Sequence, residues 1–153
     1  MAFELFWSRL SKERKIEKMV EVKIDYKGEL RCEALHGPSQ VVIATDAPVD
    51  NQGRGEAFSP TDLVATALGT CMATIMGITA RQKEVDLRGL KILVRKEMSA
   101  DLPRRIAKLA VEITMPIVQE HFAAKSLKAA ALGCPVNHSI HPDIEVDTSW
   151  IWQ

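Results

Sequence analysis

The stretch Ser59–Thr79, SPTDLVATALGTCMATIMGIT, decides the fold that we expect for this chain. Ser59 suits the N-cap of a helix, Pro60 suits the first helical position, and Asp62 lies where a capping box places an acid. The residues that follow are apolar on almost every side, so the helix must be buried on every side. A chain of 153 residues has little core to spare, which favours burial between two subunits.

The composition predicts a soluble protein of the cytoplasm. Hydrophobic residues make up 46% of the chain, and 20 basic residues balance 20 acidic ones, which argues against nucleic acid as the partner. No segment approaches the roughly 20 uninterrupted apolar residues of a membrane span, and the charged N-terminus is not a secretory signal. The three cysteines are widely separated, as expected in a reducing compartment.

Two parts of unequal size are expected along the chain. Residues 1–18 place Phe3, Phe6, Trp7 and Leu10 on one face at helical spacing, which predicts an amphipathic helical extension. This helix packs on its own domain or on a partner subunit, or it anchors the protein to a membrane surface. Residues 19–153 form the main domain.

Outside the central helix, the apolar patterns predict an α+β fold with antiparallel sheets. Short alternating runs up to Ala44 predict a three-stranded meander, and the glycine-rich stretch Asp46–Phe58 predicts a loop. We then expect a pair of strands at Leu90–Met98 and Ile106–Met115. A helix at Val118–Leu132, capped by Gly133, a short helix at Cys134–Ile140 and a last strand from Ile144 onward should follow.

Two of the three cysteines could carry chemistry. Cys134 precedes Pro135 at the expected start of a helix, where unpaired backbone N–H groups favour the thiolate over the thiol. Cys71 lies in the middle of the apolar helix, where a cysteine is either a small core residue or a nucleophile. Cys32 lies in a predicted strand, and we interpret it as structural.

Two further groups of residues leave alternatives open. Cys134, His138 and His141 have the spacing C-x3-H-x2-H, which could bind zinc, but the chain has no paired C-x2-C to complete a closed site. The loop before the central helix supplies Arg54 and Glu56, which are either solvated loop charges or parts of a site at the start of that helix.

Three stretches, which make up two motifs, give the chain a resemblance to a known family. Phe58–Leu63 leads into Ala67–Met72, and Cys134–Ser139 follows much later; together they are similar to the two cysteine motifs of the OsmC/Ohr family. The expected order of strands and helices is also similar. The resemblance covers about residues 20 to 150 and leaves out the N-terminal extension.

This resemblance implies an OsmC-like fold in an intertwined homodimer, with a long central helix and active sites at the subunit interface. It makes Cys71 the peroxidatic cysteine, which attacks the peroxide O–O bond and becomes a sulfenic acid. Cys134 is then the resolving cysteine, which forms a disulfide that a dithiol such as a lipoylated protein reduces. The implied chemistry needs no cofactor and no metal.

The resemblance also implies an arginine, held by an acid, that activates Cys71. A sulfur in apolar surroundings stays a thiol unless a cation lies close to it. Arg31 is the first candidate for that cation and Arg54 the second. The family's acid commonly follows the proline of the helix-start motif, where this chain has Thr61; Glu56 or Asp62 could substitute for it.

The function that we expect is therefore a thiol-dependent peroxidase for organic hydroperoxides. An apolar pocket suits fatty or aromatic hydroperoxides better than hydrogen peroxide, and its expected lining is Leu68, Met72, Ile75 and Met76. The alternative is a non-catalytic protein of the same fold that binds an apolar small molecule at the dimer interface or senses redox state. Thr61 keeps that alternative open because the family's acid is missing there.

Overall fold

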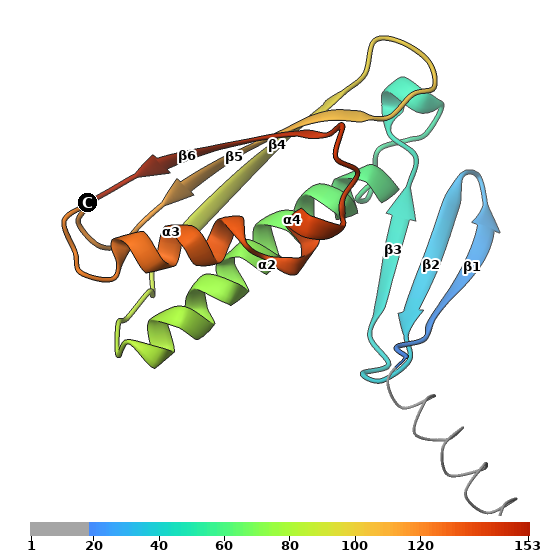
Figure 1. Cartoon of the computed structure of the whole chain (residues 1–153). Helices are drawn as coiled ribbons and strands as arrows, with labels where there is room; N and C mark the ends of the chain where they lie inside the picture. The colour runs from blue at the N-terminus through green and yellow to red at the C-terminus, as the bar shows by residue number, and fades with distance from the viewer. Residues whose placement is uncertain (1–18) are drawn as a thin grey trace, which may run out of the picture. The chain divides into compact units, whose positions relative to one another are not determined.

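The computed structural model describes residues 19–153, and the amphipathic helix expected at 1–18 lies outside them. The elements follow the order β1 (Val22–Gly28), β2 (Arg31–His36), β3 (Val42–Asp46), η1 (Val49–Asn51), α2 (Pro60–Gln82), β4 (Lys91–Met98), β5 (Ile106–Thr114), α3 (Ala124–Leu132), α4 (Pro135–Ser139) and β6 (Glu145–Ile151) (Figure 1). The chain divides into two compact units, one up to Pro60 and one from Thr61 onward.

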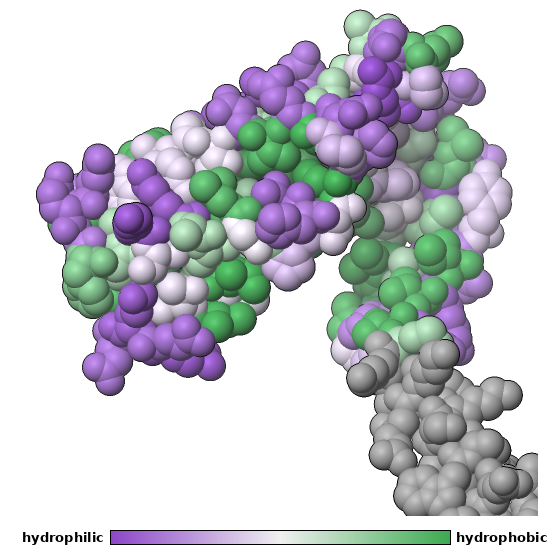
Figure 2. All heavy atoms as spheres, in the orientation of Figure 1, coloured by the Kyte–Doolittle hydropathy of each residue, from purple (hydrophilic) through white to green (hydrophobic). Residues whose placement is uncertain are grey.

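The unit up to Pro60 contains the antiparallel meander β1-β2-β3, as predicted. Because side chains alternate along a strand, one face of β1 carries Val22, Ile24 and Tyr26. These three side chains are 54%, 67% and 65% exposed in the single chain. Figure 2 shows apolar patches over this sheet. A sheet face of this kind is normally covered in a finished assembly.

The stretch between β3 and α2 is a tight loop, as predicted, with one turn of 3-10 helix, η1. The Gly55 N–H donates to the Ala47 carbonyl at 3.2 Å, and the Asp46 N–H donates to the Phe58 carbonyl at 3.1 Å. A Cβ atom added to Gly53 would lie 1.7 Å from the Ala47 oxygen, so only glycine fits there. The loop therefore has one defined conformation that returns Glu56 toward the sheet.

The unit from Thr61 onward is a three-stranded sheet covered by helices on one face (Figure 1). β4 and β5 are antiparallel, as predicted, and β6 runs parallel to β5. The core between sheet and helices consists mainly of the buried residues Leu68, Met72, Met76, Leu109, Val111, Ile113, Met115 and Leu127. Lys128 of α3 lies over the stacked indoles of Trp150 and Trp152, which ties α3 to the last strand.

The central helix α2 is long and apolar, as its sequence predicts. Gly69 allows it to approach the sheet closely, because an added Cβ would lie 3.0 Å from Val94 Cγ2. By length and composition it is the one helix of residues 19–153 that could cross a membrane, with a mean hydropathy of 1.7. Only 33% of the most apolar 18-residue stretch of this helix is buried in the single chain. Much of the surface of the helix is therefore available to a partner.

One predicted helix is shorter than expected. α3 begins at Ala124, whereas the apolar spacing predicted a start at Val118. The preceding residues form turns instead: the His121 N–H donates to the Val118 carbonyl, and the His121 ring accepts the N–H of Ala123. These local bonds occupy donors that a longer helix would need, and a periodic pattern does not reveal them. Gly133 ends α3 as predicted, but with φ −87° rather than a left-handed conformation.

Candidate active site

Cys134 occupies the N-cap position of α4, as its place before Pro135 predicted. Its backbone is extended, and its Sγ accepts a hydrogen bond from the Asn137 N–H at 3.4 Å. The Asn137 side chain in turn donates to the Leu132 carbonyl at 2.8 Å, which fixes this turn to the end of α3. The thiol is completely buried. The short helix therefore presents a sulfur to the interior of the unit.

Burial, rather than the helix N-terminus, dominates the acidity of this thiol. Burial raises the pKa of Cys134 above its usual value, and the N–H groups of Asn137 and Val136 offset this only in part. The N–H groups at the helix start therefore favour the thiolate, as expected, but burial outweighs them. The reason is that α4 has only 5 residues, and its few N–H groups do not replace the water lost by a buried sulfur.

Cys71 is the neighbour of Cys134, although the two are far apart in the sequence. The Cys71 side chain further raises the pKa of Cys134, so the two sulfurs are close enough to interact. Cys71 is half-buried on α2, Cys134 is buried, and neither forms a disulfide in this structure. Cys32, on β2, is also a free thiol. The fold thus brings together the two cysteines that the sequence singled out.

Arg31 forms ion pairs with two carboxylates of its own unit. Its Nη2 pairs with Glu56 and lies 3.5 Å from Oδ2 of Asp46. Glu56 is one of the two acids that the sequence offered for this role. Asp46 was not singled out as a site residue because it marks the start of a loop. The strand register would have indicated it, since Arg31 and Asp46 are direct partners across β2 and β3.

Asp62, the other candidate acid, pairs with a lysine. Lys96 Nζ lies 2.6 Å from Asp62 Oδ1 and 2.7 Å from Thr61 Oγ1. Lys96 is a residue that the sequence did not single out, and its side chain is only 15% exposed. The alternation of β4 gives a signal for it, because a lysine follows Ile92 and Val94 on the inward-facing side of the strand.

The remaining candidates lie in solvent-facing positions. Arg54, the second choice for the activating cation, pairs with Glu29 at 3.6 Å, and both side chains are more than half exposed. His141 faces Asp143 at 3.7 Å. Within residues 19–153, no three His, Cys, Asp or Glu side chains come together as metal ligands do, so the zinc interpretation of Cys134 and His138 has no support.

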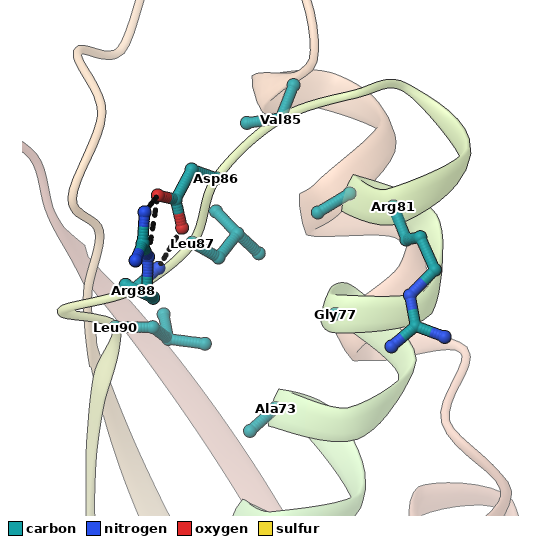
Figure 3. A pocket seen from close by; sticks show the side chains of 9 residues that line it. Ala73, Gly77, Arg81, Val85, Asp86, Leu87, Arg88 and Leu90 are labelled. Carbon is teal, nitrogen blue, oxygen red and sulfur yellow. Dashed lines mark hydrogen bonds and ion pairs between the residues drawn. The ribbon is translucent and has the colours of Figure 1, made fainter.

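The residues expected to line the substrate pocket divide into two groups. Leu68, Met72 and Met76 are completely buried in the core, whereas Ile75 is half-buried. Of the four residues, only Ile75 therefore has accessible surface that a substrate could contact. A separate hollow of about 470 Å³ lies near the end of α2 (Figure 3). It is lined by Ala73, Gly77, Ala80, Arg81, Val85, Asp86, Leu87, Arg88 and Leu90, so none of the four expected residues contributes to it.

The profile of the OsmC-like protein family matches residues 53–149. The chain is similar to the crystal structure of an osmotic stress induced and detoxification response protein from Psychrobacter arcticus 273-4. The two sequences are 48% identical, the match covers 88% of this chain and 96% of that one, and the TM-score is 0.80.

Two more distant solved structures share the fold. An organic hydroperoxide resistance protein OsmC from Legionella pneumophila is 17% identical over 87% of this chain and 96% of that one, with a TM-score of 0.71. An organic hydroperoxide resistance protein from Elizabethkingia anophelis is 12% identical over 88% of this chain and 96% of that one, with a TM-score of 0.72. Among proteins of curated function, none matches significantly. The family profile and the Psychrobacter relative confirm what the cysteine motifs predicted: the chain belongs to the OsmC-like protein family.

Proposed function

We propose that this protein is a thiol peroxidase that reduces organic hydroperoxides through a two-cysteine cycle. The observation that carries the proposal is the pair of neighbouring free thiols Cys71 and Cys134, held on α2 and at the start of α4. Neighbouring thiols can form a disulfide once one of them has been oxidised. The names of two structural relatives, both organic hydroperoxide resistance proteins, agree with this chemistry.

The surroundings of the two sulfurs support different roles for them. Cys71 is half-buried, which makes it the more accessible of the two to a peroxide, whereas Cys134 is completely buried. The raised pKa of Cys134 keeps that sulfur a thiol near neutral pH, and a thiol is a poor nucleophile toward peroxide. We therefore assign the peroxidatic role to Cys71 and the resolving role to Cys134, as the family resemblance implies.

The cycle has three balanced steps. The Cys71 thiolate attacks one peroxide oxygen, so that an S–O bond forms, the O–O bond breaks, and the departing alkoxide takes up a proton to become an alcohol. The Cys134 sulfur then displaces hydroxide from the Cys71 sulfenic acid, which gives a disulfide and, with the proton of Cys134, water. A dithiol finally donates two electrons and two protons to the disulfide and becomes a disulfide itself. We propose a lipoylated protein as this reductant.

The thiolate of Cys71 requires a nearby cation, and Arg31 is our proposal for it. Arg31 lies at the start of β2, and its guanidinium is held by Glu56 and Asp46. A strand residue with two carboxylate partners is positioned better than Arg54, which lies in the loop with one exposed partner. Glu56 is our choice for the orienting acid because it pairs with Arg31, while Asp62 pairs with Lys96.

We also propose that the protein works as a homodimer with α2 at the interface. Only 33% of the most apolar window of α2 is buried in the single chain, and Ile78 on this helix is 50% exposed. A second copy of the chain would cover this apolar surface. An apolar channel at that interface, reached past Ile75, would favour organic hydroperoxides over hydrogen peroxide.

Turnover measurements test the proposed function. Stopped-flow mixing with cumene hydroperoxide should show rapid peroxide consumption that continues with dihydrolipoamide and stops early with glutathione, because a dithiol reduces a buried disulfide more efficiently. Hydrogen peroxide should be the poorer substrate. Protein that consumes no cumene hydroperoxide with either reductant would contradict the proposal and support the non-catalytic alternative.

A further inference from the structure

We infer that Asp46 is a positioning residue that holds the Arg31–Glu56 pair in its working geometry. The inference rests on the proposed function, in which Arg31 activates Cys71. Asp46 ends β3 and lies directly opposite Arg31 in the register of β2 and β3. Its position is therefore set by the sheet rather than by the loop that follows it. Neither the cysteine motifs nor the start of α2 includes it.

One oxygen of Asp46 fixes both members of the pair. Its Oδ2 lies 3.5 Å from Arg31 Nη2 and accepts the backbone N–H of Glu56 at 2.9 Å. The carboxylate of Glu56 pairs with the same Arg31 nitrogen. Asp46 thus sets the place from which the Glu56 side chain reaches the guanidinium, in addition to its own attraction for Arg31.

Burial explains why Asp46, rather than Glu56, determines this geometry. The Glu56 side chain is 57% exposed, so water and salt weaken its pairing and its rotamer is not fixed by packing. Asp46 is 1% exposed. Its backbone N–H is also bonded, to the Phe58 carbonyl at 3.1 Å, so neither end of the residue can move independently.

The arrangement is not the one that stability alone would select. Within residues 19–153, Asp46 Oδ1 and Arg31 Nε are buried without a hydrogen-bond partner. Buried polar atoms of this kind lower stability, and proteins tolerate them mainly at functional sites. The guanidinium is therefore held through Nη2, while its Nε donor is not used by any described residue.

A double-mutant cycle tests this inference. The variants are Asp46→Asn, Arg31→Met and the double substitution; the observable is the stopped-flow rate at which cumene hydroperoxide oxidises Cys71, followed against pH. Asp46→Asn should slow the reaction about tenfold near neutral pH, and the rise of the rate with pH should move to higher pH, as we also expect for Arg31→Met. The double variant should be no slower than Arg31→Met alone, because Asp46 acts through Arg31.

The control is Asp25→Asn, which makes the same change of charge at an exposed position of β1 and should leave the rate unchanged. A wild-type rate in Asp46→Asn would overturn the inference, and so would an equal additional loss in the Arg31→Met background. If Asp46→Asn does not fold, Asp46→Glu replaces it in the cycle; it keeps the charge but moves the carboxylate by one methylene, and the same non-additivity is expected.

A failure of the proposed function is distinguishable from a failure of this inference. If the wild-type protein does not react with cumene hydroperoxide, the proposed peroxidase function is wrong. In that case the same cycle is measured by alkylation of Cys71 with iodoacetamide, in chains where Cys32 and Cys134 are serine. Slower, non-additive alkylation in Asp46→Asn would still support the positioning role, and unchanged alkylation would end it.

Discussion

Cys71 raises the pKa of the Cys134 thiol, which shows that two cysteines from distant parts of the sequence lie within reach of each other. One of these sulfurs is half-buried and the other is buried completely. The difference in burial, together with the raised pKa of Cys134, suits two roles, in which peroxide oxidises Cys71 and Cys134 then forms the disulfide.

The two cysteines should respond differently to substitution. Cys134→Ser should leave the first peroxide step nearly intact but stop turnover with dihydrolipoamide, because no resolving thiol remains. Cys71→Ser should abolish both steps, and Cys32→Ser serves as the control that changes neither. Rapid single-turnover kinetics separate these effects. If Cys71→Ser kept peroxide consumption and Cys134→Ser lost it, the roles would be reversed.

The raised pKa of Cys134 predicts a pH dependence of stability. A thiol whose pKa is higher in the folded than in the unfolded protein stabilises the fold fully below the ordinary value of 9.0, and this contribution disappears as the pH rises through the folded-state value. Relative to Cys134→Ala, the wild-type free energy of unfolding should therefore be constant from about pH 7 to about pH 9 and fall above it. Urea unfolding of both proteins measures this difference, and a difference that grows with pH would contradict it.

Arg31 should control the reactivity of Cys71. Arg31→Met should slow oxidation of Cys71 at least about tenfold near neutral pH, because it removes the cation that we propose favours the thiolate. Arg54→Met is the matched control, and its exposed pair with Glu29 predicts little effect. A large loss in Arg54→Met with none in Arg31→Met would transfer the role to the loop.

Gly53 should be indispensable for the loop that presents Glu56. In Gly53→Ala the new Cβ would lie 1.7 Å from the Ala47 oxygen, so the loop must move. We expect a loss of more than about 1 kcal/mol in the free energy of unfolding, together with slower oxidation of Cys71. Gln52→Ala, at an exposed position of the same loop, should change neither quantity. Wild-type behaviour of Gly53→Ala would show that the loop conformation is not required.

The apolar surface of α2 should hold two subunits together. Ile78→Lys places a charge on this surface, where the side chain is 50% exposed in the single chain, and should shift the dimer toward monomer at micromolar concentration. Leu102→Lys is the control, because Leu102 is 88% exposed in the β4–β5 turn. Light scattering of both variants gives the answer; a stable wild-type monomer would rule out the interface altogether.

Most of the fold could be predicted from patterns that act locally. Alternation in β1 to β3, the apolar run of α2 and the proline after Cys134 each determine their own element, because they depend only on neighbours in the sequence. The start of α3 could not be predicted in this way. The His121 ring binds a backbone N–H there, and such a bond leaves no trace in hydrophobic periodicity.

The candidate site was less predictable, because long-range packing determines it. The spacing of Cys71 and Cys134 did not show that their sulfurs meet, and the acidity of Cys134 followed burial rather than the helix N-terminus. Asp46 and Lys96 gain their partners from adjacent strands and from α2, so only the strand register or the assembled unit reveals them. Leu68 and Met72 were expected in a pocket but pack in the core.

Mass analysis after one equivalent of cumene hydroperoxide tests the central claim most directly. The wild-type chain should lose two hydrogens, and peptide mapping should find Cys71 joined to Cys134, with Cys32 still a thiol. Cys134→Ser should instead gain one oxygen on Cys71, trapped as the sulfenic acid. A wild-type chain that keeps all three thiols after peroxide is added, or that forms its disulfide through Cys32, would contradict the two-cysteine mechanism.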